Sequence, residues 1–224
     1  MMRRLRVVVI AVLVTMAVPG AAFGITNGEV DSVDEYPFVG LLAFYDSDGE
    51  YSYRCSGTLI TDTVMVTAAH CTDGIATARA LFGVEITDDF RMGMGGTTGT
   101  PHTHPNYDPV TVDLDVGLVV PDSLAPVSGP YPTLPNAGFL GELKRSGDIG
   151  DDTFVAVGYG GVTGSPPPII EFDLFRRFAT SPYQGVTQNN LHLMQNPNVD
   201  DSGAPASATP AAPTSGRTPW SWWR

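Results

Sequence analysis

Positive charge is scarce in this chain. Its 224 residues include 12 Lys and Arg against 24 Asp and Glu, a formal net charge of −12, and eleven of the twelve basic residues are Arg. A surface this acidic repels phosphate backbones and anionic lipid headgroups, so neither nucleic acid nor a membrane surface is an expected partner. Hydrophobic residues make up 42% of the chain, which excludes a disordered composition and provides for one sizeable core or two small ones.

Long hydrophobic runs are also few. The clearest is residues 7–18, which follow three arginines and precede an Ala-Phe-Gly sequence at 22–24. Twelve residues of helix span only about 18 Å, too short for a hydrocarbon core of about 30 Å. The pattern is typical of a secretory signal, so we expect residues 1–24 to be removed and the mature protein to be extracellular and not attached to a membrane. The wealth of Gly, Pro, Ala and Arg indicates a bacterial gene.

The chain has only two cysteines, Cys55 and Cys71, which lie 16 positions apart. Two cysteines alone cannot make a structural zinc site, and apart from the adjacent His70 no residue has ligand spacing, so we expect no metal and no cofactor. In an exported chain the pair is expected to form a disulfide, which in a loop of this size stabilises the fold by about 3 kcal/mol. Two free thiols are the alternative.

No segment shows a long helical period, and 25 Gly and 19 Pro interrupt the chain throughout. A mostly apolar run at 37–45 and a second segment at 50–59 flank an Asp-Ser-Asp-Gly sequence that suits a tight hairpin, and 114–120 and 153–158 are further candidate strands. A proline-rich passage at 121–135 divides the chain into two similar halves. The fold class is therefore predicted to be all-β, with two small barrels.

Four stretches carry the chemistry: ITNGE from Ile25, CSGTLITDTVMVTAAHC from Cys55, HPNYDPVTVDLDVGLVV from His104, and DDSGAP from Asp200. Together they resemble the trypsin-like serine protease family over residues 25–205, and the order His, Asp, Ser is the order of that family.

The resemblance implies a secreted serine endopeptidase with two packed antiparallel β-barrels of the six-stranded chymotrypsin type. Residues 25–120 would form the first barrel, 121–135 the linker, and 136–205 a second, incomplete barrel, followed by a low-complexity, disordered tail at 206–224. Its partner would be a protein or peptide substrate, and it would act as a monomer.

Three residues would make the triad: His70 as general base, Asp115 as its partner and Ser202 as nucleophile. We expect Asp115 to lie in an apolar strand, where an unpaired carboxylate is costly and a hydrogen bond from His70 would satisfy it. Asp113, two residues earlier on the same strand face, is the competing candidate. The alternative for His70 is a satisfied core histidine, and for Ser202 a linker serine.

The resemblance also implies supporting roles around Ser202. The backbone N–H groups of Asp200 and Ser202 would form the oxyanion hole, and a free α-ammonium at Ile25 would pair with Asp201. Asn196 would lie at the base of the specificity pocket, so a preference for Arg or Lys is not expected.

Besides Asn196, two features depart from the family. Asp200 stands where the family has glycine, which disfavours the oxyanion-hole conformation. Only 22 residues follow Ser202, and residues 206–219 contain no large aliphatic or aromatic side chain. This end resembles a truncated or frame-shifted reading of a longer gene, with a natural disordered tail as the alternative. A catalytically impaired binding protein and a non-functional product are therefore the alternative functions.

Overall fold

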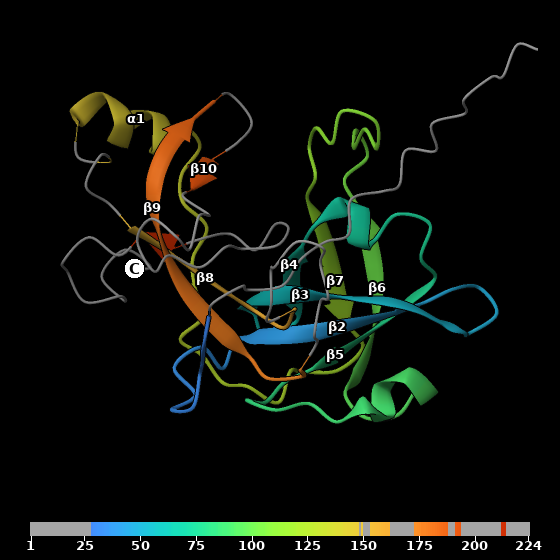
Figure 1. The fold of residues 1–224 in the computed structure, drawn as a ribbon. Coiled ribbons are helices and arrows are strands. Elements are labelled where there is room, and N and C mark those ends of the chain that lie inside the picture. The colour runs from blue at the N-terminus through green and yellow to red at the C-terminus, as the bar shows by residue number, and fades with distance from the viewer. Residues whose placement is uncertain are drawn as a thin grey trace, which may run out of the picture.

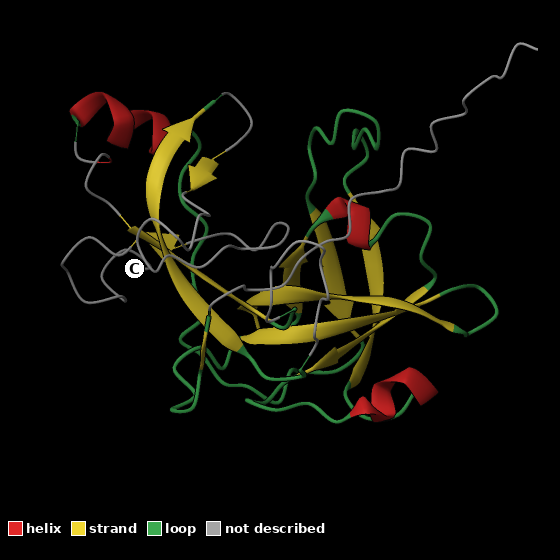
Figure 2. Ribbon diagram, viewed as in Figure 1, coloured by secondary structure: helices red, strands yellow, loops and turns green. Residues whose placement is uncertain are grey.

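The computed structural model describes residues 28–147, 149, 153–161, 173–187, 191–193 and 212–213. Strands predominate over helices in these ranges, and they form two sheets that lie side by side (Figures 1 and 2). The predicted all-β class is confirmed. No helix among the described residues is long and apolar enough to cross a membrane.

The first sheet closes into a barrel of six antiparallel strands in the order β2, β3, β4, β7, β6, β5. The strands are β2 (Val39–Tyr45), β3 (Tyr51–Thr61), β4 (Val64–Thr67), β5 (Thr77–Leu81), β6 (Thr97–Thr103) and β7 (Gly117–Pro121). Two 3-10 turns, η1 (Ala69–Cys71) and η2 (Asp88–Met92), lie in its connections. This barrel matches the expected six-stranded type.

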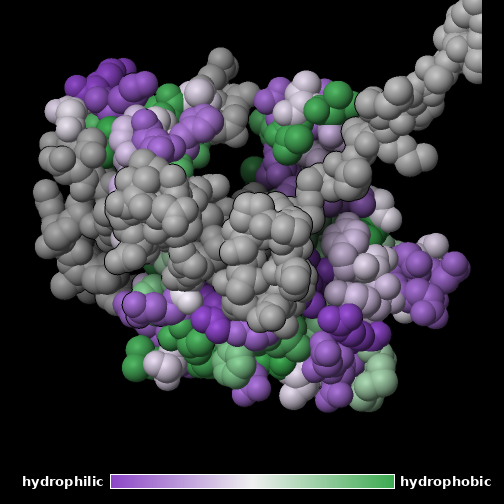
Figure 3. Space-filling model, in the orientation of Figure 1, coloured by the Kyte–Doolittle hydropathy of each residue, from purple (hydrophilic) through white to green (hydrophobic). Residues whose placement is uncertain are grey.

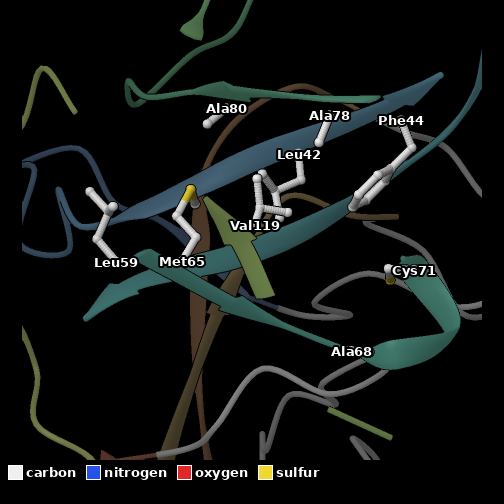
Figure 4. Packing of buried hydrophobic residues seen from close by; sticks show 9 residues of the cluster. All are labelled: Leu42, Phe44, Leu59, Met65, Ala68, Cys71, Ala78, Ala80 and Val119. Carbon is white, nitrogen blue, oxygen red and sulfur yellow. The ribbon is translucent and has the colours of Figure 1, made fainter. Parts of the chain in front are cut away.

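The burial of strand β2 explains why its sequence is an uninterrupted apolar run. All seven of its residues are buried. Leu42 and Phe44 belong to the cluster that fills the barrel (Figure 4), whereas Leu41 and Ala43 belong to a second cluster with Phe90 of η2. Because both faces of the strand are covered, alternation with polar residues is lost, and each fully buried Leu contributes about 1.5–3 kcal/mol.

The β2–β3 hairpin confirms the predicted turn. The Asp46 carboxylate accepts hydrogen bonds from the N–H groups of Asp48 at 2.9 Å and Glu50 at 3.0 Å. Gly49 has a φ of +82°, which glycine adopts without steric cost. The acidic residues here therefore build the turn.

The second sheet has five strands, β1 (Glu29–Val30), β8 (Thr153–Gly158), β9 (Arg177–Val186), β10 (Leu191–Leu193) and β11 (Ala212–Pro213). Strand β9 is central, since it pairs with β1, β8 and β10. Although residues 25–120 were predicted to belong to the first barrel, β1 pairs with this second sheet. Several residues of the predicted second barrel lie outside the described ranges, so its closure stays a prediction.

One short helix, α1 (Phe139–Ser146), was not expected from the sequence. It has no buried residue, and hydrophilic side chains predominate around it in Figure 3. Gly147 follows it with a φ of +84°, as is common just after a helix. With only eight residues and a glycine inside, α1 is too short to produce a clear helical period.

The segment predicted as a linker is packed against the barrel. Ala125, Val127 and Tyr131 contact the barrel cluster, and the Tyr131 hydroxyl donates to the carbonyl of Val127. The N–H of Ala125 donates to the carbonyl of Asp62 at 2.9 Å. The connection between the halves is therefore a part of the first half's surface.

Candidate active site

His70 lies in η1, at the end of the barrel. Strand β4 ends at Thr67, three residues before His70. The change of direction is stabilised by N–H groups that donate to carbonyls three residues earlier, from Cys71 to Ala68 and from Thr72 to Ala69. The histidine is thus presented at the rim, with its side chain 32% exposed.

A disulfide fixes this turn to the barrel wall. Cys71 is joined to Cys55 of β3, with their Cα atoms 6.4 Å apart. The Tyr53 hydroxyl, also on β3, donates to the carbonyl of Cys71 at 3.2 Å. The backbone next to His70 is therefore held covalently and by a hydrogen bond. The predicted disulfide is confirmed.

The Asp115 carboxylate contacts His70 twice. Its Oδ1 accepts the backbone N–H of His70 at 2.8 Å, and its Oδ2 lies 2.7 Å from Nδ1 of the ring. Its side chain is only 16% exposed. The two contacts fix the carboxylate and the imidazole relative to each other, so neither group has to be ordered when a substrate binds.

This geometry determines where the ring carries its proton. An ionised carboxylate can only accept hydrogen bonds, so Nδ1 of His70 must be the donor. In the neutral ring the lone pair is then on Nε2, on the other side of the imidazole from Asp115. A ring in this state can accept a proton at Nε2, as a general base does.

Asp115 lies in the loop before β7. The expectation that it stands within a strand is wrong, because β7 begins at Gly117 and Leu114 has a φ of +57°. The preceding turn is ordered by Asp108, whose carboxylate accepts the N–H of Val110 at 2.8 Å. Backbone N–H groups lower the pKa of Asp108. Left-handed backbone is uncommon in a strand, so the conformation of Leu114 prevents the strand from beginning there.

The competing candidate Asp113 lies in the same loop, not on a strand. Its side chain is exposed, and its Oδ2 accepts the hydroxyl of Thr111 at 3.1 Å. Asp115 supplies both of the hydrogen bonds described for His70. Of the two aspartates, Asp115 is thus the one the fold brings to the ring.

A close backbone approach joins the histidine turn to β7. A Cβ at Gly117 would lie 2.7 Å from the Ala68 carbonyl oxygen and 2.7 Å from Oγ1 of Thr72. The buried Thr72 hydroxyl donates to the carbonyl of Ala69 at 3.1 Å and lies 2.9 Å from the hydroxyl of Thr103 in β6. These contacts fix the position of the turn that carries His70. They could not be found from the sequence, because a buried threonine has no distinctive sequence pattern.

Two tyrosines near the site have raised pKa values, through burial and through neighbouring negative charges. Partial burial, and after it the charge of Asp115, raises the pKa of Tyr107. Burial also raises the pKa of Tyr53, with Asp73 adding to the effect. Both phenols stay neutral at physiological pH, so they provide polar surface without adding charge.

Among the described residues, one group of potential metal ligands includes His70. Ligand atoms of Cys55, His70 and Cys71 lie within 4.8 Å of one another. However, the two sulfurs are bonded to each other, and zinc binds thiolates. The residues present do not fit a metal while the disulfide is intact.

The remaining predicted site residues lie outside the described residues. These are Ile25, Asn196, Asp200, Asp201 and Ser202.

A comparison with protein families matches residues 25–135 to the trypsin family. Over 153 residues the chain is 26% identical to alkaline trypsin B of Manduca sexta, covering 68% of this chain and 57% of that protein. Over 124 residues it is 29% identical to achelase-1 of Lonomia achelous, covering 55% and 54%. The chain thus spans about half the length of these insect relatives, and the bacterial origin indicated by composition stays a prediction.

Among solved structures, HL collagenase has a TM-score of 0.54 and 16% identity, with 72% of this chain and 64% of that chain covered. At this identity the likeness shows the fold alone. The expected chymotrypsin-type arrangement is thereby confirmed.

Proposed function

We propose, from the match of residues 25–135 to the trypsin family and the similarity to insect trypsins, that this chain is a secreted serine endopeptidase of the trypsin-like kind. The observation that supports this most is the double contact between His70 and Asp115, at 2.8 and 2.7 Å. A satisfied core histidine would need only one partner, whereas here the ring is one-third exposed and leaves Nε2 for another group.

In the proposed reaction Ser202 is the nucleophile. As its oxygen bonds to the peptide carbonyl carbon, Nε2 of His70 takes the hydroxyl proton. The tetrahedral intermediate then collapses, the C–N bond breaks, and His70 gives that proton to the leaving amine. Water repeats the sequence on the acyl-enzyme and frees Ser202. Asp115 stabilises the imidazolium during both acylation and deacylation, so no cofactor is needed.

Charge also develops on the carbonyl oxygen, where the backbone N–H groups of Asp200 and Ser202 would donate. Losing one such donor costs about 10²- to 10³-fold in rate, and the aspartate at position 200 makes this the weakest part of the site. An α-ammonium at Ile25, exposed by signal removal, would pair with Asp201 and order this loop. Asn196 would line the specificity pocket.

The pattern of residues 1–24 supports secretion, and so does the disulfide, because such bridges persist outside the reducing cytosol. The substrate is a protein or peptide chain. The enzyme acts as a monomer.

A serine-directed fluorophosphonate probe tests the proposal on the full secreted chain. Labelling of the wild type that disappears in Ser202→Ala and His70→Ala supports the nucleophile and its base. The matched control is Ser47→Ala in the exposed β2–β3 turn, which keeps its labelling. A folded wild type that is never labelled would refute the proposal and favour a binding protein.

A further inference from the structure

Arg176 is the largest fully buried side chain of the described residues, with 0% exposure, and it directly precedes β9. Its Nε donates to Oδ2 of Asp31 at 2.8 Å, and Asp31 is also 0% exposed. Its Nη1 donates to the carbonyl of Val39 at 3.2 Å, and its Nη2 contacts the carboxylate of Asp34. Neither Arg176 nor Asp31 is among the residues proposed for the chemistry.

The backbone of Arg176 joins the same segments. Its N–H donates to the carbonyl of Val84, in the connection after β5, at 2.7 Å, and its carbonyl accepts the N–H of Asp31 at 2.9 Å. The Asp31 carboxylate also accepts the N–H groups of Glu35 and Tyr36. One arginine therefore holds the N-terminal segment, the barrel and the start of β9 together. We call Arg176, Asp31 and Asp34 the arginine clasp.

A second contact between the halves involves strand β3, which carries the disulfide cysteine Cys55. The N–H of Tyr159, just after β8, donates to the Ser56 hydroxyl at 2.8 Å, and Ser56 follows the disulfide cysteine Cys55. The Tyr159 hydroxyl donates to the carbonyl of Gly83, next to the Val84 carbonyl that Arg176 engages. The clasp and the wall of the candidate site are therefore parts of one interface.

Arg176 stays protonated in spite of its burial. Burial opposes the charged form, but Tyr159, Asp31 and Asp34 outweigh it, and the pKa of the guanidinium is raised. A buried ion pair nevertheless adds little to stability compared with apolar side chains of similar size, because both charges lose their hydration. What the planar guanidinium does provide is a set of fixed directions, since its donors diverge in one plane.

We propose that Arg176 is a positioning residue, which through the arginine clasp fixes the barrel and the second sheet at one relative placement. This rests on the proposed function, in which His70 and Asp115 come from the barrel half and Ser202 from the other. A displacement of about 1 Å remote from the chemistry can cost about 10²-fold in rate. The clasp thus acts on the alignment of Ser202 with His70 and not on either group itself.

The first test separates positioning from stability. The double variant Asp31→Asn/Arg176→Met removes both buried charges and keeps one amide oxygen, which can still accept the N–H of Glu35. We expect it to fold, with kcat lowered between about tenfold and 100-fold and KM nearly unchanged. The control Arg91→Met breaks an exposed ion pair with Asp88 and leaves kcat as in the wild type.

The second test measures placement without catalysis. Spin labels on Ser47→Cys in the β2–β3 turn and Arg145→Cys in α1, both exposed, report the distance between the halves. One narrow distance distribution is expected in the wild type and in Arg91→Met, and a broadened or shifted one in the double variant. If the double variant fails to fold, Arg176→Lys, which keeps the charge but not the fork, is expected to show the same broadening.

The results distinguish the two proposals. An unlabelled, inactive wild type whose distance distribution still depends on Arg176 would overturn the protease and keep the clasp. A folded variant with unchanged kcat and an unchanged distribution would overturn the clasp and leave the protease intact.

Discussion

Replacing Asp115 with Asn changes one atom of the carboxylate and tests the histidine contact directly. In the wild type the carboxylate accepts both the backbone N–H of His70, at 2.8 Å, and its ring Nδ1–H, at 2.7 Å. An amide has one oxygen and one NH₂ group, so it can accept only one of these. The backbone N–H cannot change its role, and it will therefore hold the amide oxygen.

The NH₂ group then faces the ring, and Nδ1 must become an acceptor. The proton moves to Nε2 and removes the lone pair that should receive the Ser202 proton. In a serine protease triad this tautomer error costs about 10⁴-fold in kcat, or about 5 kcal/mol of transition-state stabilisation. Folding should suffer far less, by about 1 kcal/mol, because a charged acceptor is only exchanged for a neutral one.

The assay is turnover of a peptide ester by the purified secreted chain, with urea unfolding as the measure of folding. Asp113→Asn is the matched control, since its exposed carboxylate lies two residues away in the same loop, and it should keep at least half of the activity. An Asp115→Asn enzyme that retained a tenth or more of the wild-type kcat would refute the assignment of the proton.

Three further predictions concern the surroundings of the site. Replacing Cys55 and Cys71 together by Ala should lower the unfolding free energy by about 3 kcal/mol, measured in urea. Gly117→Ala should cost about 1–3 kcal/mol by overpacking, whereas Gly141→Ala, with nothing within 4 Å, should not destabilise. Burial raises the pKa of Tyr159 to about 12, against about 10 unfolded, so ionisation of this group should contribute about 2 kcal/mol to the loss of stability between pH 10 and 12. Tyr159→Phe should therefore lose about 2 kcal/mol less than the wild type over this range in urea unfolding, and an equal loss in the two proteins would refute the prediction.

The barrel strands could be predicted because their local patterns agree with their burial. The apolar run at 37–45 became β2, and the Asp-Gly turn after it closed a hairpin, since both depend on neighbours in the sequence. The start of the strand predicted at 114–120 was wrong for the opposite reason, since β7 begins only at Gly117. Leu114 is apolar yet exposed and left-handed, and that conformation is set by the loop around Asp108, which no periodicity reveals.

The candidate site divides in the same way. His70, Asp115 and the cysteines were identified from motifs, because each motif surrounds one functional residue. Arg176 and Asp31 lie 145 positions apart, and neither segment has a pattern that names the other. An arginine in a strand-like segment is usually exposed, so its complete burial could emerge only from the packed structure.

The central claim is that imidazole, carboxylate and hydroxyl meet in one site. A crystal structure of the full secreted chain tests it by the distance from the Ser202 hydroxyl to Nε2 of His70. We predict about 3 Å, with Asp115 on the other side of the ring as described. A Ser202 hydroxyl more than about 6 Å away, well beyond the reach of a hydrogen bond, beside an intact His70–Asp115 contact, would contradict the proposed triad.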